Sequence, residues 1–172
     1  EIDFRPLLEE RFVAACRRDH PLAKKRRTTW SELAAHDFIT VAKSSGNRLL
    51  IDQALAGVRG APQSLYEAQH VTTMLGLVEA GLGVAAVPSL AMPANKDHPL
   101  LVSVPLEEPV VTRRVGLIRR AGRTLAPAAQ QLHDFLAATP NVAPKAAPKA
   151  APQAAPKVRA ATAPKAPRQR RR

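Results

Sequence analysis

Cysteine and long apolar runs are scarce in this sequence, and each scarcity excludes a class of protein. The 172 residues hold one cysteine, Cys16, which cannot form an internal disulfide and so favours a reducing, cytoplasmic setting. No run of 18 apolar residues occurs, so we expect no membrane-spanning helix and no membrane partner. Five scattered histidines and one cysteine supply neither a nucleophile with its base nor a ligand set. We therefore expect no enzyme, no catalytic residues, no metal and no cofactor.

Acidic side chains are missing from residues 140–172, which form a basic tail. The tail holds nine of the 26 Lys and Arg residues and leaves 17 basic against 14 acidic side chains in the body, so it dominates the formal net charge of +12. The nine residues are Lys145, Lys149, Lys157, Arg159, Lys165, Arg168, Arg170, Arg171 and Arg172. Prolines recur every four residues from Pro140 to Pro156, which predicts an extended, disordered segment. These residues either neutralise nucleic-acid phosphates without reading sequence, or only solubilise the chain.

The body alternates strand and helix patterns, which predicts an α/β fold. The expected strands cover 11–17, 38–41, 64–68, 84–87, 100–104 and 113–118, and the expected helices cover 29–35, 47–56, 70–80 and 125–136. Thr29 and Glu32 have the spacing of a capping box, and Cys16 falls on an apolar strand face, which predicts a buried, inert thiol.

Residues 70–88 read as a helix, a glycine turn at Gly81, a buried strand and a proline stop at Pro88. A phosphate-binding glycine loop needs the opposite order, with the strand first and the helix after the glycines. Gly81 and Gly83 therefore predict a tight connection from helix to strand and not a nucleotide site.

Seven short segments carry a resemblance to a known family. They are Leu-Glu-Glu-Arg-Phe-Val at 8–13, Arg-Asp-His-Pro-Leu-Ala at 18–23, Glu-Leu-Ala at 32–34, Asp-Phe-Ile at 37–39, Val-Glu-Ala-Gly-Leu-Gly-Val-Ala at 78–85 with Pro88, Arg-Val-Gly-Leu-Ile at 114–118 and Leu-Ala-Pro-Ala-Ala at 125–129. In order and spacing, residues 8 to about 138 resemble the effector-sensing domain of LysR-type transcriptional regulators.

The resemblance implies a fold like that of type 2 periplasmic binding proteins, in which two α/β lobes are joined by two crossing strands. Residues 1–19 would then be the first crossing strand and 20–112 one complete effector-binding lobe. Residues 113–139 would be the return strand and the terminal helix of the other lobe, which is mostly missing. No helix-turn-helix pattern occurs in 1–139, so the resemblance places operator DNA binding in a domain outside this chain. It also implies a homo-oligomer, a dimer or tetramer, in the full-length parent.

The resemblance further implies a small-molecule effector in the cleft between the lobes. The positions that it assigns to this site are Phe38, Ile39, Thr40, Ser44, Ser45, Gly46, Asn47, Arg48, His70, Val71, Thr72, Gly83 and Val84. Lys43 and Arg48 would favour a carboxylate. Serine and threonine at these places are also ordinary helix-start residues, so a purely structural role stays open.

A solute-binding receptor of a transport system shares this fold and is the alternative. It would carry a secretion signal or lipid anchor upstream of Glu1, so the residues encoded there would separate the two.

Overall fold

A mixed sheet forms the centre of the fold. The computed structural model describes residues 1–94 and 98–138, and the nine basic tail residues with their predicted disorder lie outside this part of the chain. The elements in chain order are β1 (Ile2–Arg17), η1 (Pro21–Lys24), β2 (Thr28–Thr29), α1 (Trp30–Leu33), β3 (Phe38–Val41), α2 (Gly46–Leu55), β4 (Ser64–Ala68), α3 (Val71–Glu79), β5 (Val84–Pro88), η2 (Ser89–Ala91), β6 (Leu101–Glu107), β7 (Thr112–Arg120) and α4 (Pro127–Ala138). The predicted α/β fold class is confirmed.

The strands run in the order β2-β6-β1-β5-β3-β4, and β7 pairs with β1 outside this path. β3 is parallel to both β4 and β5, whereas β1 is antiparallel to β5 and β6. Because β3, β4 and β5 point the same way, their carboxyl ends meet at one edge of the sheet, at Val41, Ala68 and Pro88.

Helices cover both faces of the sheet, which explains the unbroken apolar run of β5. On one face, Val84 and Ala86 of β5 share a buried cluster with Ile51 of α2. On the other face, Ala85 and Val87 share a cluster with residues of α3. Cys16 belongs to the first cluster and is buried, so its predicted burial is confirmed, and burial raises the pKa of its thiol to about 11.

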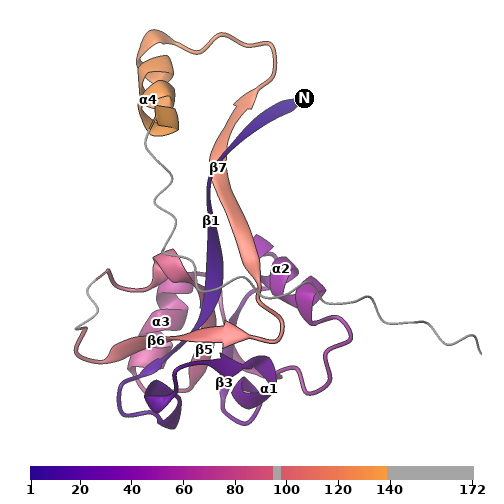
Figure 1. Cartoon of the computed structure of the whole chain (residues 1–172), viewed down its shortest axis with the longest axis vertical. Helices are drawn as coiled ribbons and strands as arrows, with labels where there is room; N and C mark the ends of the chain where they lie inside the picture. Colours follow the sequence, from indigo (N-terminus) through magenta and orange to yellow (C-terminus); the bar gives the residue numbers. More distant parts are fainter. Residues whose placement is uncertain (95–97, 139–172) are drawn as a thin grey trace, which may run out of the picture.

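A two-stranded ribbon leaves the lobe. The first half of β1 pairs with β7 from Ile2, opposite Arg120, to Arg11, opposite Thr112. The ribbon extends away from the remaining strands, with α4 beside its far end (Figure 1). Arg5 donates a hydrogen bond to the carbonyl oxygen of Ala137 at 3.2 Å, which ties the ribbon to the end of α4.

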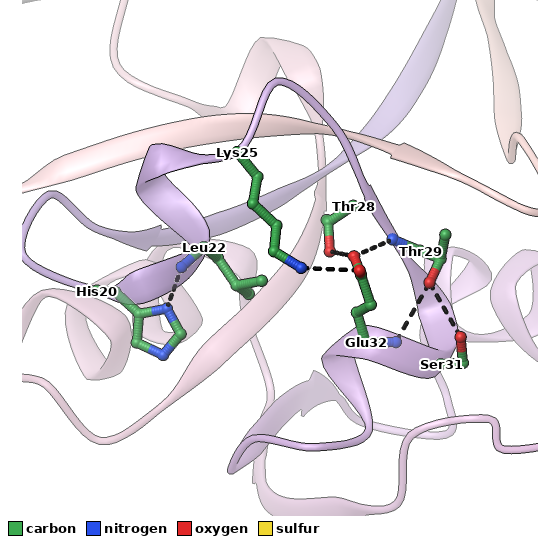
Figure 2. A network of polar contacts seen from close by, with 7 residues as sticks. All are labelled: His20, Leu22, Lys25, Thr28, Thr29, Ser31 and Glu32. Atoms are coloured by element: carbon green, nitrogen blue, oxygen red, sulfur yellow. Dashed lines mark hydrogen bonds and ion pairs between the residues drawn. The ribbon is translucent and has the colours of Figure 1, made fainter.

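The segment between β1 and β3 is held by two caps. Thr29 accepts from the Glu32 backbone N–H at 3.3 Å, and the Glu32 carboxylate accepts from the Thr29 N–H at 3.1 Å, so the predicted capping box is confirmed. Figure 2 shows that Lys25 and Thr28 also point to this carboxylate, at 2.7 Å each. The hydrogen bond from Lys25, followed by those from Thr28 and Thr29, lowers the pKa of Glu32 to about 2.

The second cap is at His20. Its Nδ1 accepts from the Leu22 N–H at 3.2 Å and closes the first turn of η1 (Figure 2). The His20 ring also lies edge-on to His36, with 4.6 Å between ring centroids. Burial, followed by the nearby His36, lowers the pKa of His20.

Several element bounds differ from those predicted. β1 begins at Ile2 instead of residue 11, because residues 2–10 are held as a strand by pairing with β7. β6 continues through Pro105, opposite Val13, although we expected a strand that ended before the proline. A strand that contains a proline loses only one backbone donor. The helix expected at 29–35 is one turn, Trp30–Leu33.

Candidate functional site

The edge where β3, β4 and β5 end is the place at which an open α/β sheet binds ligands, because loops and helix N-termini gather there. Two predicted loops lie at this edge, one between β3 and α2 and the other between β4 and α3. The Ala42 N–H donates to the Ala68 carbonyl at 2.9 Å, which joins the start of the first loop to the start of the second. The structure therefore brings residues 44–47 and residues 70–72 to one edge.

In the first loop, Ser45 is the N-cap of α2. Its hydroxyl oxygen accepts from the Asn47 N–H at 3.3 Å, and its own N–H donates to the Ala42 carbonyl at 2.9 Å. The structural role that the sequence left open is thus present. A hydroxyl also has one proton to donate, so capping leaves Ser45 able to bind a ligand oxygen. Ser44 is exposed beside it.

In the second loop, His70 occupies the N-cap position of α3 without a side-chain cap. Its carbonyl accepts from the Met74 N–H at 3.1 Å, which begins the helix. Thr72 lies in the first turn and is exposed. The backbone N–H groups of a first helical turn have no acceptor within their own helix, so they favour an anion or an acceptor oxygen at this edge.

A buried ion pair lies where the ribbon meets this edge. Glu10 is fully buried, and its Oε1 accepts from Arg113 Nε at 2.6 Å. Its Oε2 accepts from the Leu90 N–H at 2.9 Å. Arg113 Nη1 also donates to Asn47 Oδ1 at 2.9 Å, which links β7 to the first turn of α2. The sequence reasoning missed this network, because only the pairing of β1 with β7 sets Glu10 opposite Arg113.

The predicted residues of β3 do not share a face. Phe38 and Ile39 are both buried, but in the two opposite clusters, so they do not form the single apolar wall that two neighbouring residues of an effector site would be expected to form. Phe38, Thr40 and Arg48 instead line a pocket beside α2. The Nε of Arg48 donates to both carboxylate oxygens of Asp52, at 2.8 and 2.9 Å, so the charge that we expected to attract a carboxylate already has a counter-ion.

Gly83 and Val84 lie at the opposite, amino edge of the parallel strands. The Val84 N–H donates to the Asp37 carbonyl at 2.9 Å, just before β3 begins. Gly83 has a φ of +152°, and a Cβ there would stand 2.2 Å from the Asp37 oxygen, so close packing explains this glycine. A pocket of about 520 Å³ at this edge is lined by Gly83 with Arg17, His20 and His36. The structure does not bring Gly83 and Val84 together with the two loops.

Residues 1–94 and 98–138 hold neither a candidate metal site nor a candidate membrane-spanning helix. No group of three or more His, Cys, Asp or Glu side chains there could hold a metal ion. No helix in those ranges is long and apolar enough to cross a bilayer.

Comparison with known proteins identifies the class. The family model of the LysR substrate-binding domain matches residues 1–140, so this chain belongs to that family. The chain is 51% identical over 135 residues to YbhD of Escherichia coli K12, an uncharacterized HTH-type transcriptional regulator, and the match covers 78% of this chain and 42% of YbhD. The chain thus spans about two fifths of that relative.

Solved structures agree on the fold. The effector-binding domain of QuiR in complex with shikimate is 27% identical with a TM-score of 0.67, and the match covers 78% of this chain and 63% of that one. The regulatory domain of Synechocystis CcmR in complex with 2-PG is 24% identical with a TM-score of 0.73, over 83% and 69% of the two chains. The predicted periplasmic-binding-protein-like fold is confirmed, since these neighbours are effector-binding domains of that type.

Proposed function

We propose that this chain is the effector-binding part of a LysR-type transcriptional regulator, and that a small carboxylate binds at the edge where β3 and β4 end. The proposed contacts are the hydroxyls and backbone N–H groups of the two loops. They come from Ser44, Ser45, Gly46, Asn47, His70, Val71 and Thr72.

The convergence of two helix starts on one edge carries this proposal. α2 and α3 both begin there, and the Ala42 to Ala68 hydrogen bond keeps their loops adjacent. Helix N-termini attract anions because their first N–H groups lack acceptors and the helix dipole is positive at that end. QuiR supports a carboxylate, since its related domain holds shikimate, a hydroxylated carboxylic acid.

The regulatory role follows from the relatives. YbhD is named as an HTH-type transcriptional regulator, which favours a regulator over the solute-binding receptor that the sequence left as the alternative. We propose that operator DNA is read by a part of the regulator that this chain does not span, and that the regulator is a homo-oligomer. Effector binding would then change DNA binding through its different affinities for two arrangements of the oligomer.

We also propose that the chain is divided into three segments with different roles. Residues 20–112 would form the effector-binding lobe, with residues 1–19 and 113–139 as the crossing strands and terminal helix. The two crossing strands would then be β1 and β7, whose antiparallel pairing forms the ribbon.

The site can be tested by titrating the full chain with shikimate while NMR records its amide chemical shifts. We expect saturable changes at residues 44–47 and 70–73. Thr72→Ala and Ser45→Gly should each weaken binding by about 0.5–1.5 kcal/mol, the value of a neutral hydrogen bond. Glycine is chosen at residue 45 because it remains an acceptable N-cap.

Ser103→Ala is the matched control, since Ser103 is an exposed hydroxyl residue on β6, away from both loops. It should leave the affinity unchanged. Equal affinities in all three variants would remove the two loops from the site.

A further inference from the structure

The side-chain amide of Asn47 is held in one orientation by Arg113. Asn47 lies in the first turn of α2, and its Oδ1 accepts a hydrogen bond from Arg113 Nη1 at 2.9 Å. A guanidinium group only donates, so the amide oxygen must face it. Turning the amide over would set two donors against each other and lose this bond. The NH2 group of Asn47 is therefore the end that remains for another partner.

Arg113 is itself held by a carboxylate with contacts on both oxygens. The fully buried Glu10 binds Nε and Nη2 of Arg113 through Oε1, at 2.6 Å each. Through Oε2 it accepts from the Leu90 N–H at 2.9 Å, and the Ser89 hydroxyl lies 3.5 Å from the same oxygen. Because the guanidinium is already fixed, it can orient Asn47 with little further loss of side-chain freedom.

This network lies at the edge of the sheet where we place the effector. Leu90 follows Pro88, the carboxyl end of β5, by two residues, and Asn47 lies at the start of α2 on the same edge. Glu10 and Arg113 come from the paired strands β1 and β7. The ribbon thus contributes side chains to an edge that the sequence assigned to two loops alone.

The free end of Asn47 is a donor that a ligand can reach. Within residues 1–94 and 98–138, no hydrogen bond uses the Nδ2 protons of Asn47, and this nitrogen is not buried. An amide NH2 group donates two hydrogen bonds and accepts none. Glu10 and Arg113 neutralise each other, so a carboxylate beside Asn47 meets no unpaired negative charge from this network.

We infer that Asn47 Nδ2 donates to a carboxylate oxygen of the effector, and that Arg113, anchored by Glu10, is the positioning residue that keeps this donor available. The inference rests on the effector site proposed above and adds a side-chain contact to it. It also assigns a choice of ligand. A carboxylate oxygen accepts from this amide, whereas an ammonium group has only donors, so the start of α2 discriminates against cationic ligands.

The NH2 group of Asn47 gives its own pair of signals in a proton–nitrogen NMR spectrum, separate from the backbone amides. In the shikimate titration of the full chain, this pair should shift and saturate together with the backbone amides of residues 44–47 and 70–73. Backbone shifts without a shift of the Asn47 pair would overturn the inference and leave the proposed site intact. The absence of both would contradict the proposed site and the inference with it.

Two replacements of Asn47 separate the roles of its two ends. Asn47→Leu loses both ends and should weaken shikimate binding by about tenfold, the effect of one hydrogen bond to a charged group. Asn47→Asp keeps an oxygen for Arg113, so it should fold as stably as the parent chain. It replaces the donor with a negative charge, so it should bind shikimate more weakly than Asn47→Leu does. Parent-like affinity in either variant would overturn the inference.

Gln53→Glu is the matched control for Asn47→Asp. It makes the same change from amide to carboxylate at an exposed position of α2, and it should leave the affinity for shikimate unchanged. An equal loss of affinity in both variants would mean that the added charge acts from a distance, and it would contradict a direct contact with Asn47.

The double variant Glu10→Leu with Arg113→Met tests the positioning role. It removes the donor to Asn47 without leaving a buried charge, so it should bind shikimate about as weakly as Asn47→Leu. Adding Asn47→Leu should cause no further loss, because Arg113 acts through Asn47. Parent-like affinity in the double variant, or additive losses in the triple variant, would overturn the role of Arg113. If the double variant fails to fold, the Asn47 signals and Asn47→Asp, which both keep the Glu10–Arg113 pair, decide the outcome.

Discussion

Arg113 of β7 holds the buried carboxylate of Glu10 on β1, with Nε and Nη2 each 2.6 Å from Oε1. The two residues are direct partners in the strand pairing, although they are 103 positions apart. The pair lies where the ribbon leaves the lobe. Arg113 also donates a hydrogen bond to Asn47 in the first turn of α2.

Removing one member of this pair should destabilise the chain strongly. Arg113→Met leaves the Glu10 carboxylate buried without its cation, which costs about 3 kcal/mol or more. Urea denaturation followed by circular dichroism should show this loss in the free energy of unfolding.

The double variant Glu10→Leu with Arg113→Met is the control. It removes both charges and should recover much of the loss, because an apolar pair is not penalised by desolvation. Additive losses in the double variant would mean that the two side chains act independently.

His20 predicts a dependence of stability on pH. Its Nδ1 must be unprotonated to accept from Leu22, and burial together with His36 lowers its pKa in the folded chain. The folded state therefore binds protons less readily than the unfolded state, in which the pKa is about 6.5. The stabilisation is fully present above that value and is lost as the pH falls through the folded pKa.

His20→Asn separates this effect from other titrations, because asparagine accepts the same cap hydrogen bond and does not titrate. The unfolding free energy of the parent chain, relative to that of the variant, should fall between about pH 7.5 and pH 5. Thermal or urea unfolding across this range measures the difference. Parallel curves for the two proteins would show that His20 does not contribute.

The basic tail predicts nucleic-acid binding that depends on salt. Its nine cationic residues have no acidic residue among them, so DNA phosphates would bind them through release of counter-ions. Fluorescence anisotropy should show a steep loss of affinity as salt rises, and equal affinity for unrelated DNA sequences. A chain truncated to residues 1–139 should lose this binding, and retained binding would place the phosphate contacts in the body.

The order of helices and strands could be predicted because local patterns encode it. The capping box at Thr29 and Glu32 and the left-handed closing residue Gly81, with a φ of +83°, both follow from residues near each other in the sequence. The relation between Glu10 and Arg113 could not, because it depends on a register between distant strands. For the same reason the sequence grouped Gly83 with the loops, although the direction of β5 places it at the opposite edge.

α4 has an exposed apolar surface. None of its described side chains is buried, and Leu132 is 58% exposed. On the ribbon, Ile2 and Ile118 are 68% and 71% exposed. Burying one such side chain contributes about 1.5–3 kcal/mol, so α4 and the ribbon gain free energy when another surface covers them.

We therefore predict that the isolated chain of 172 residues self-associates through α4 and the ribbon. Sedimentation velocity should show a concentration-dependent oligomer that Leu132→Gln weakens. Leu65→Gln on β4 is the matched control, since Leu65 is 58% exposed and β4 is the edge strand that β5 and β3 separate from β1, and it should leave association unchanged. Amide exchange at low concentration should be slow in Val84 and Val87, which are fully buried in β5, and fast along α4. A monomer in which α4 exchanges as slowly as β5 would mean that α4 docks on its own chain, and it would contradict the assignment of α4 to a second lobe.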